Sequence, residues 1–308
     1  LINYIKNITN NYLDIEIIST IKNYNLDNLL NKIKKYNTTK KEVYFVGMTN
    51  SGKSTLINSL LGEKVAITAN KSQTTRTVIK AIINNKNSQI IFTDTPGIHK
   101  PKTKLGTTMN DNAWSTIPEV DIILFIVEAT SNGIGKGDQM ILEKLKESNK
   151  KAILVINKID LIEKEKLLKL IDLYNKEYNF VATIPICATQ NENTNKIITE
   201  IEKNLPEGPA YYDVEEYTDQ TERQLVEELI REKALRLLDQ EVPHGIYVEV
   251  EKMKLRKTSK NQDIYDIEAT IYVLRKSHKG IVIGKDGSML KRIGTYARQD
   301  IEKMLDTK

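Results

Sequence analysis

The sequence has little of what builds cross-linked, zinc-stapled or membrane-spanning proteins. It contains one cysteine, Cys187, and three histidines among 308 residues. A single cysteine excludes an internal disulfide framework, and the one thiol and three imidazoles are too few and too scattered along the chain for a structural zinc site. No run of about 18 apolar residues and no signal-peptide pattern is present. These absences predict a cytoplasmic protein in a reducing compartment.

What the sequence does have is a globular composition with an uneven charge. The chain is 40% hydrophobic and 28% charged, and its 308 residues predict two domains. The net charge is +5, yet residues 251–308 alone carry 14 Lys and Arg against 8 Asp and Glu. The positive surplus therefore lies at the C-terminal end. A polyanion partner such as nucleic acid and a solvated basic surface are both open explanations.

A glycine-bearing loop is the strongest functional signal. It follows an apolar strand at 43–46, precedes a helical stretch at 55–61, and fits the phosphate-loop pattern. Such a loop turns backbone N–H groups towards phosphate oxygens, and the helix N-terminus adds positive charge. We expect Lys53 to reach the β- and γ-phosphates and the Ser54 hydroxyl to bind Mg²⁺. The predicted nucleotide-binding residues of this loop are Gly47, Asn50, Ser51, Gly52, Lys53, Ser54 and Thr55.

Two further segments would complete a triphosphate site. The first is Lys71-Ser72-Gln73-Thr74-Thr75-Arg76, in which the hydroxyl of one threonine can bind Mg²⁺. Thr75 is the preferred candidate and Thr74 the second. The second is a strand that ends in Asp94-Thr95-Pro96-Gly97. Asp94 can hold the metal through water, and the glycine N–H can bond the γ-phosphate. The predicted catalytic residues are Lys53, Thr75 and Gly97, and the predicted metal ligands are Ser54, Thr75 and Asp94.

A later motif predicts which base is bound. A buried strand at 152–156 ends in Asn157-Lys158-Ile159-Asp160. The Asp160 carboxylate can accept two hydrogen bonds from guanine, and adenine offers no such pair of donors. Ala188 could offer its N–H to the guanine oxygen, and Cys187 is interpreted as a small loop residue rather than a nucleophile. The predicted base-binding residues are Asn157, Lys158, Asp160, Cys187 and Ala188.

Strands and helices alternate through residues 43–204, which predicts a P-loop NTPase domain on a doubly wound, mostly parallel sheet. The motifs above, together with Ala66-Ile67-Thr68 and Ile98-His99-Lys100, resemble those of the Era family of GTPases. The resemblance implies a Ras-like G domain that hydrolyses GTP. Ile98 stands where Ras-type enzymes carry a water-orienting glutamine, so intrinsic hydrolysis should be slow. Asn50 matches an asparagine that helps related GTPases bind K⁺, so we expect K⁺ to stimulate hydrolysis.

Residues 221–308 predict a separate α+β domain. Alternation indicates strands at 246–251 and 267–273, joined by a basic turn at 252–260. The order helix–strand–strand–helix–GxxG–helix is that of a type II KH domain without its last strand. A GxxG loop lets a nucleic-acid backbone approach closely, beside an apolar groove for bases. The predicted RNA-binding residues are Gly284, Lys285, Asp286, Gly287, Lys279, Lys291 and Arg292.

Val242-Pro243-His244-Gly245 and Ser277-His278-Lys279-Gly280-Ile281 also resemble the Era family. This implies a module that grips single-stranded RNA at the 3′ end of small-subunit rRNA. The family's closing strand should follow Lys308 and is absent, so we expect an exposed sheet edge and weaker stability or RNA affinity than a complete relative has. Peripheral membrane contact is implied by the resemblance alone, with no anchor readable in the sequence. We expect a monomer.

Residues 1–42 do not fit this plan. A strand at 13–18 and a helix at 26–36 precede the phosphate loop, and residues 1–60 resemble the circularly permuted ribosome-assembly GTPases of the YqeH type. An unrelated extension, an accessory layer and a splice of two GTPase genes at their shared phosphate-loop sequence all remain open. We favour the splice.

The sequence as a whole is interpreted as four parts. They are an N-terminal extension, a GTP-binding G domain, a linker and a truncated KH domain, at residues 1–42, 43–204, 205–220 and 221–308. The predicted function is a GTP-hydrolysing switch that binds rRNA and assists assembly of the small ribosomal subunit. Two rivals remain, a non-catalytic RNA-binding module that only senses GTP versus GDP, and a spliced chimera with impaired function.

Overall fold

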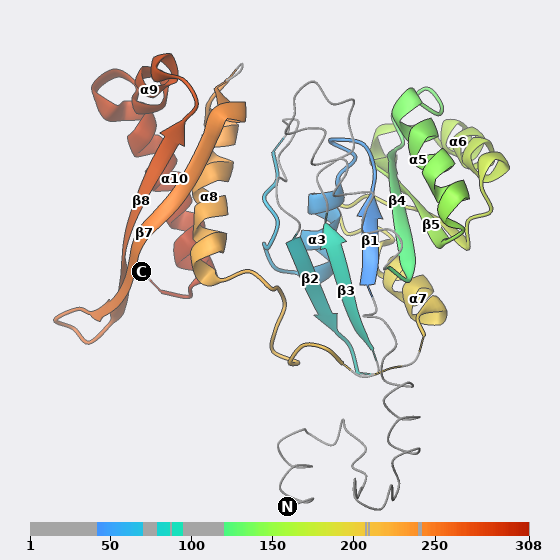
Figure 1. The fold of residues 1–308 in the computed structure, drawn as a ribbon, viewed down its shortest axis with the longest axis horizontal. Helices are drawn as coiled ribbons and strands as arrows, with labels where there is room; N and C mark the ends of the chain where they lie inside the picture. Colours follow the sequence, from blue (N-terminus) through green and yellow to red (C-terminus); the bar gives the residue numbers. More distant parts are fainter. Residues whose placement is uncertain are drawn as a thin grey trace, which may run out of the picture.

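The chain folds into two domains (Figure 1). The computed structural model describes residues 42–69, 79–86, 88–94, 120–206, 208, 210–239 and 242–307. The strand and helix predicted within residues 1–42, and the predicted site residues Thr74, Thr75 and Gly97, lie outside the described residues.

The first domain is built on a sheet whose described strands follow the order β2-β3-β1-β4-β5-β6. The strands are β1 (Glu42–Val46), β2 (Ile79–Asn84), β3 (Gln89–Asp94), β4 (Ile122–Glu128), β5 (Lys151–Asn157) and β6 (Ala182–Pro185). Neighbouring strands run parallel except β2, which pairs antiparallel with β3 at the sheet edge. The predicted mostly parallel sheet is confirmed, and β1 lies at its centre.

Helices cover both faces of this sheet because its central strands are apolar on both sides. On β4, Leu124 and Ile126 join the core beneath one pair of helices, while Ile123 and Phe125 join the core on the opposite face. The first face is covered by α3 (Lys53–Leu61) and α7 (Thr194–Asn204), and the second by α5 (Lys136–Ser148) and α6 (Lys164–Glu177). Because β1, β3, β4, β5 and β6 run parallel, their carboxyl ends lie at one edge of the sheet, where the described motif residues at 47–54, 94 and 157–160 are found.

The second domain packs two helices on one face of a hairpin. Its elements are α8 (Glu222–Leu237), β7 (Ile246–Lys257), β8 (Asp263–Val273), α9 (Lys276–Ile283) and α10 (Ser288–Met304). The Thr221 hydroxyl and the Gln224 side chain form a capping box that starts α8. Alternate residues of β7, namely Ile246, Val248 and Val250, are buried against α8 and α10. The predicted element order of this domain is confirmed.

The stretch expected to be a basic turn at 252–260 is mostly strand. β7 continues to Lys257 and pairs with β8 throughout, so that only the end of the stretch turns. Cross-strand ion pairs support this extension, because Lys252 meets Glu268 at 2.5 Å and Arg256 meets Asp266 at 2.5 Å. The acidic partners of this basic run lie on the next strand, β8, so the run taken alone did not indicate that the strand continues.

The described part of the linker is not a loose connection. It lies along the outer edge of β2, where Thr218 forms an antiparallel bridge with Ala81 and the Ile82 N–H donates to the Tyr217 carbonyl at 2.9 Å. The Asn84 side-chain amide also donates to three linker carbonyls. The backbone of this stretch therefore pairs with the outer edge of β2.

Candidate nucleotide and nucleic-acid sites

The phosphate loop joins the end of β1 to the start of α3 at the carboxyl edge of the sheet (Figure 1). A Cβ at Gly47 would lie 2.4 Å from the Ile126 carbonyl oxygen. A Cβ at Gly52 would lie 2.1 Å from the Asn157 amide nitrogen, and the φ of Gly52 is +94°. Both glycines are therefore required by close packing, and the second also by its left-handed backbone. Asn50 is left-handed as well, with φ 68°.

Lys53 is buried inside this loop. Its Nζ donates to the carbonyls of Gly47 at 2.9 Å and Met48 at 2.8 Å. Burial lowers its pKa to about 8, although the charge of Asp94 acts in the opposite direction. The ammonium thus lies among backbone dipoles at the base of the loop. A phosphate oxygen would be a stronger acceptor for it than these neutral carbonyls.

Two of the predicted metal ligands meet. The Ser54 hydroxyl donates to Asp94 Oδ2 at 3.0 Å, across 40 residues of sequence. Asp94 is fully buried at the end of β3. A hydroxyl and a carboxylate oxygen are hard ligands of the kind that Mg²⁺ prefers, so this pair fits the predicted metal. Thr75 and Gly97, the remaining members of the triphosphate set, lie outside the described residues.

Asn157 joins the phosphate loop to the base-recognition loops. Its side-chain amide donates to the Ser51 carbonyl at 3.0 Å. Its Oδ1 accepts from the backbone N–H groups of Lys158 at 2.8 Å and Ala188 at 3.1 Å. The Ala188 N–H already donates to Asn157 Oδ1, so the predicted hydrogen bond from this N–H to a guanine oxygen would have to be shared with Asn157. Asn157 therefore bonds the phosphate loop and both base-recognition loops at once.

The other base-site residues follow from the same loops. Asp160 is exposed within a single 3-10 turn, η2 (Ile159–Leu161). Lys158 has φ 66° and its Nζ meets Glu128 at 2.7 Å, a partner that the sequence analysis missed. Glu128 is the last residue of β4 and lies opposite Asn157 on β5, so knowing that these strands are neighbours would have indicated Glu128 as a partner of Lys158. Cys187 is buried with its Sγ 3.2 Å from Thr189 Oγ1, as suits a structural residue.

The GxxG segment forms an exposed turn between α9 and α10, at η4 (Lys285–Gly287). A Cβ at Gly284 would lie 2.8 Å from the Met289 nitrogen, whereas nothing lies within 4 Å of a Cβ at Gly287. Asp286 and Gly287 both have positive φ. The predicted cations around the turn are all exposed, namely Lys279, Lys285, Lys291 and Arg292. The turn thus has open space at Gly287, and the four exposed cations lie on the turn and on the two helices that flank it.

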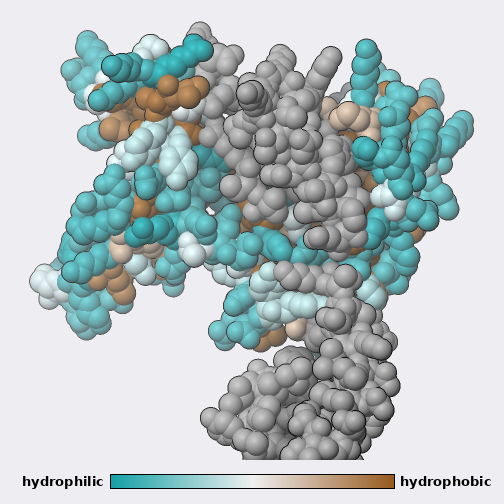
Figure 2. All heavy atoms as spheres, viewed as in Figure 1, coloured by the Kyte–Doolittle hydropathy of each residue, from teal (hydrophilic) through white to brown (hydrophobic). Residues whose placement is uncertain are grey.

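Exposed apolar side chains lie beside these cations. Figure 2 shows hydrophobic atoms gathered at the α9 end of a largely hydrophilic KH surface. The exposed apolar residues of α9 and the adjoining segments are Leu274, Ile281, Ile283 and Leu290. An apolar surface beside a basic turn is what nucleobases next to a bound backbone would contact.

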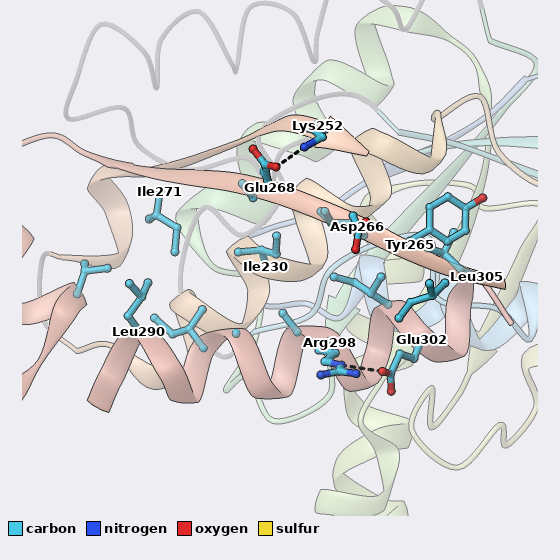
Figure 3. Close-up of a pocket in the computed structure, with 18 of the residues that line it drawn as sticks. Ile230, Lys252, Tyr265, Asp266, Glu268, Ile271, Leu290, Arg298, Glu302 and Leu305 are labelled. Carbon is cyan, nitrogen blue, oxygen red and sulfur yellow. Dashed lines mark hydrogen bonds and ion pairs between the residues drawn. The ribbon is translucent and has the colours of Figure 1, made fainter. Parts of the chain in front are cut away.

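A groove of about 960 Å³ continues from this end along α10 (Figure 3). Its walls are β8 above, with Ile271, and α10 below, with Leu290; Leu305 lies just after the end of α10. Within residues 242–307, β8 pairs only with β7, so its second edge lines the groove. The side chains along it are only half-buried, including Ile267.

Family models match both domains. The 50S ribosome-binding GTPase family matches residues 42–158, and the KH domain family matches residues 241–308. Within the described part of the chain, no helix is both long and apolar enough to cross a bilayer.

Similar proteins match most of the chain. GTPase Era of Ruminiclostridium cellulolyticum is 50% identical over 266 residues, which cover 86% of this chain and 88% of the relative. GTPase Era of Caldanaerobacter subterraneus is 50% identical over 261 residues, covering 85% and 86%. A crystal structure of Era in complex with MgGDPNP and nucleotides 1506–1542 of 16S ribosomal RNA has a TM-score of 0.81 at 39% identity, covering 88% of this chain and 90% of that one. A single-residue variant of Aquifex aeolicus Era bound to GDP.AlF4⁻ has a TM-score of 0.80 at 39% identity, covering 87% and 90%.

Proposed function

The chain belongs to the GTPase Era family, and from this premise we propose that it is a GTP-driven switch whose KH domain binds the 3′ segment of 16S rRNA. The protein hydrolyses GTP as a member of that family. The observation that carries the RNA proposal is the match, across both domains, to an Era that holds MgGDPNP and a 16S rRNA fragment. The exposed GxxG turn with its four cations supports it from this chain's own residues.

We assign the nucleotide contacts as follows. Lys53 leaves the loop carbonyls and binds the β- and γ-phosphates, while N–H groups of residues 47–55 surround the phosphates. Ser54 and Asp94 hold Mg²⁺, which offsets phosphate charge and orients the terminal group. Thr75 and the Gly97 N–H contact the γ-phosphate and respond to its loss. Asn157 keeps the phosphate and base loops in register.

Guanine selectivity should depend on the exposed carboxylate of Asp160. Asp160→Asn removes an acceptor for the two guanine donors and should weaken GDP binding by about tenfold or more, while xanthosine diphosphate binding improves. Calorimetry with both nucleotides measures this, and Asp172→Asn, which changes an exposed aspartate on α6, is the matched control. An unchanged preference for guanine in the Asp160 variant would contradict the role of the Asp160 carboxylate in guanine recognition.

RNA binding should depend on the open backbone of the GxxG turn. Gly287→Asn keeps a residue that tolerates positive φ, yet its side chain would block an approaching RNA backbone. Gly62→Asn is the matched control, because Gly62 also has positive φ and an open Cβ position but lies in the G domain. We expect about tenfold weaker binding of a 16S fragment for the first variant only, by fluorescence anisotropy with GDPNP present.

A scrambled RNA of the same length and a large-subunit RNA fragment complete the binding experiment. Equal affinity for all three RNAs would contradict recognition of the 16S 3′ segment. Phosphate release with and without the 16S fragment separates the hydrolysing switch from a module that only senses GTP versus GDP. If the RNA is bound but phosphate release is never detected, the sensing module is the better description.

Three finer assignments belong to the same proposal. Asn50 contributes to a K⁺ site, so turnover should be faster in K⁺ than in Na⁺ buffer, and equal rates would exclude it.

The small ribosomal subunit is the larger partner, which places the protein in the cytoplasm where subunits assemble. The divisions at 1–42, 43–204, 205–220 and 221–308 are domain boundaries, and resequencing the gene across codons 40–60 decides whether the first part is native.

A further inference from the structure

An ion pair joins the ends of two neighbouring strands beside the base-recognition loop. Lys158, which follows β5, places its Nζ 2.7 Å from the carboxylate of Glu128, the last residue of β4. The two side chains are 32% and 35% exposed, so water only partly screens the pair. Lys158 belongs to the motif assigned to guanine, whereas Glu128 takes no part in the nucleotide contacts proposed above. Those contacts therefore leave this carboxylate without a role.

Backbone hydrogen bonds fix both partners of the pair. Glu128 lies opposite Asn157 in the pairing of β4 with β5, and just beyond it the Ala129 N–H donates to the Asn157 carbonyl at 2.8 Å. The Ser131 N–H and hydroxyl both donate to the Glu128 carbonyl, at 3.2 Å and 2.9 Å. Lys158 has a left-handed backbone, and its N–H donates to Asn157 Oδ1 at 2.8 Å. The end of β4 therefore places a carboxylate where the ammonium of Lys158 reaches it.

A second carboxylate lies within reach of the same ammonium. Asp160 comes two residues after Lys158, in the turn η2, and is exposed. The stem of a lysine is flexible, and its ammonium is attracted to any accessible carboxylate nearby. A bond between Lys158 and Asp160 would occupy the acceptor atoms that guanine needs. In the structure the ammonium lies on Glu128 instead, and among the described residues no side chain pairs with Asp160.

We propose that Glu128 is a positioning residue that increases selectivity for guanine. It binds the Lys158 ammonium and so keeps the Asp160 carboxylate available for the two guanine donors. This inference rests on the proposed function, in which Asp160 accepts from the guanine ring. Without Glu128, guanine would first have to displace the ammonium from Asp160. Because an exposed pair of this kind is weak, that competition should weaken guanine binding by about threefold to fivefold.

Glu128→Gln in the full chain tests this proposal. The amide keeps the length of the side chain but removes the charge that holds the ammonium, which leaves Lys158 free to pair with Asp160. Calorimetry with GDP and with inosine diphosphate, whose base lacks the exocyclic amine, measures how far the carboxylate recognises the base. We expect GDP affinity to fall by about threefold to fivefold and the ratio of GDP affinity to inosine diphosphate affinity to move towards one. GDPNP affinity should fall by the same factor as GDP affinity, because both carry guanine.

The matched control is Glu177→Gln. Glu177 of α6 pairs with Lys146 of α5 at 3.1 Å, so this pair also joins two elements of the G domain but lies outside the base motif. Its loss should change the affinity ratio by less than about twofold. Thermal melts of both variants show whether either substitution loosens the fold.

Two further variants identify the cation and the charge involved. In a Lys158→Met background, adding Glu128→Gln should change the ratio by less than about twofold, because no ammonium is left to pair with Asp160. Glu128→Asp, which keeps a carboxylate at this position, should retain more of the wild-type ratio than Glu128→Gln does. A role confined to packing would show neither dependence.

The outcomes separate this inference from the function beneath it. Wild-type protein that does not bind GDP, or does not prefer it to inosine diphosphate, defeats the proposed recognition of guanine itself. Wild-type protein that prefers GDP, with an unchanged ratio in Glu128→Gln, defeats only the positioning role. Equal losses for the two diphosphates, or a loss of the same size in the Lys158→Met background, also defeat it. If Glu128→Gln does not fold, Glu128→Ala removes the same carboxylate and the same ratio decides.

Discussion

The side chain of Asn157 offers the sharpest test of how the nucleotide site is held together. It is 3% exposed and bonds three backbone groups, the Ser51 carbonyl and the N–H groups of Lys158 and Ala188. Asn157→Ala removes all three bonds and leaves the freed groups little access to water. At about 1 kcal/mol for each bond, with an added penalty for groups left unpaired, the variant should lose about 3–4 kcal/mol of unfolding free energy.

The matched control is Asn58→Ala. Asn58 on α3 also bonds backbone three times, to the N–H groups of Val65 and Ala66 and to the Ala66 carbonyl at 2.7 Å. Thermal melting should report comparable losses of stability for the two variants. Calorimetry with GDP should separate them, because only Asn157 joins the phosphate loop to the base loops. We expect GDP affinity to fall about tenfold in Asn157→Ala and less than twofold in Asn58→Ala. Equal losses of affinity would refute the joining role.

Three further outcomes follow from contacts elsewhere. Gly52→Ala should lower the free energy of unfolding by about 2 kcal/mol or more and impair nucleotide binding. Gly62→Ala should lower it by only about 1 kcal/mol, because Gly62 has positive φ but no atom within 4 Å of an added Cβ. Denaturant melts of the two variants compare these losses. Burial by itself raises the pKa of Glu232, yet contacts from Lys64 and neighbours hold it below its ordinary value. The ionised Glu232 carboxylate therefore stabilises the fold above about pH 4.5, and this contribution is lost as the pH falls through the pKa of the folded state. Melts at decreasing pH should show the difference in unfolding free energy between wild type and Glu232→Gln disappear. Burial also raises the pKa of Asp138, so its ionisation costs stability as pH rises; Asp138→Asn, which keeps an acceptor for the Tyr174 hydroxyl, should be neutral or stabilising in melts at about pH 7.

Local patterns were sufficient for most elements. The apolar strands before the loops at 47–54 and 157–160 were predicted within one or two residues, because a strand buried on both faces reads as a continuous apolar run. The helix expected after the GxxG segment is confirmed as α10, which buries Ile293, Ala297 and Ile301 at four-residue spacing. The β2 strand was missed, since an edge strand following a polar stretch carries a weak signal. The extension of β7 was missed because its support comes from β8.

Site residues divide in the same way. Lys53, Ser54 and Asp94 could be named from sequence because phosphate chemistry demands those types at those spacings, and the structure brings them together. The roles assigned to all the nucleotide and RNA residues stay predictions until the variants are measured. Glu128 and Glu232 could not be named, because a lone glutamate on a strand or helix is ordinarily a solvated charge.

The sequence by itself determined the fold class, the phosphate and base motifs and the KH element order, because each is written in neighbouring residues through backbone geometry and apolar periodicity. The tertiary structure alone decided that the linker pairs with β2 and that Glu232 reaches Thr68 across 164 residues. Such contacts join groups that are individually ordinary in sequence. They become specific only when packing brings them into a buried space where each charge requires a partner.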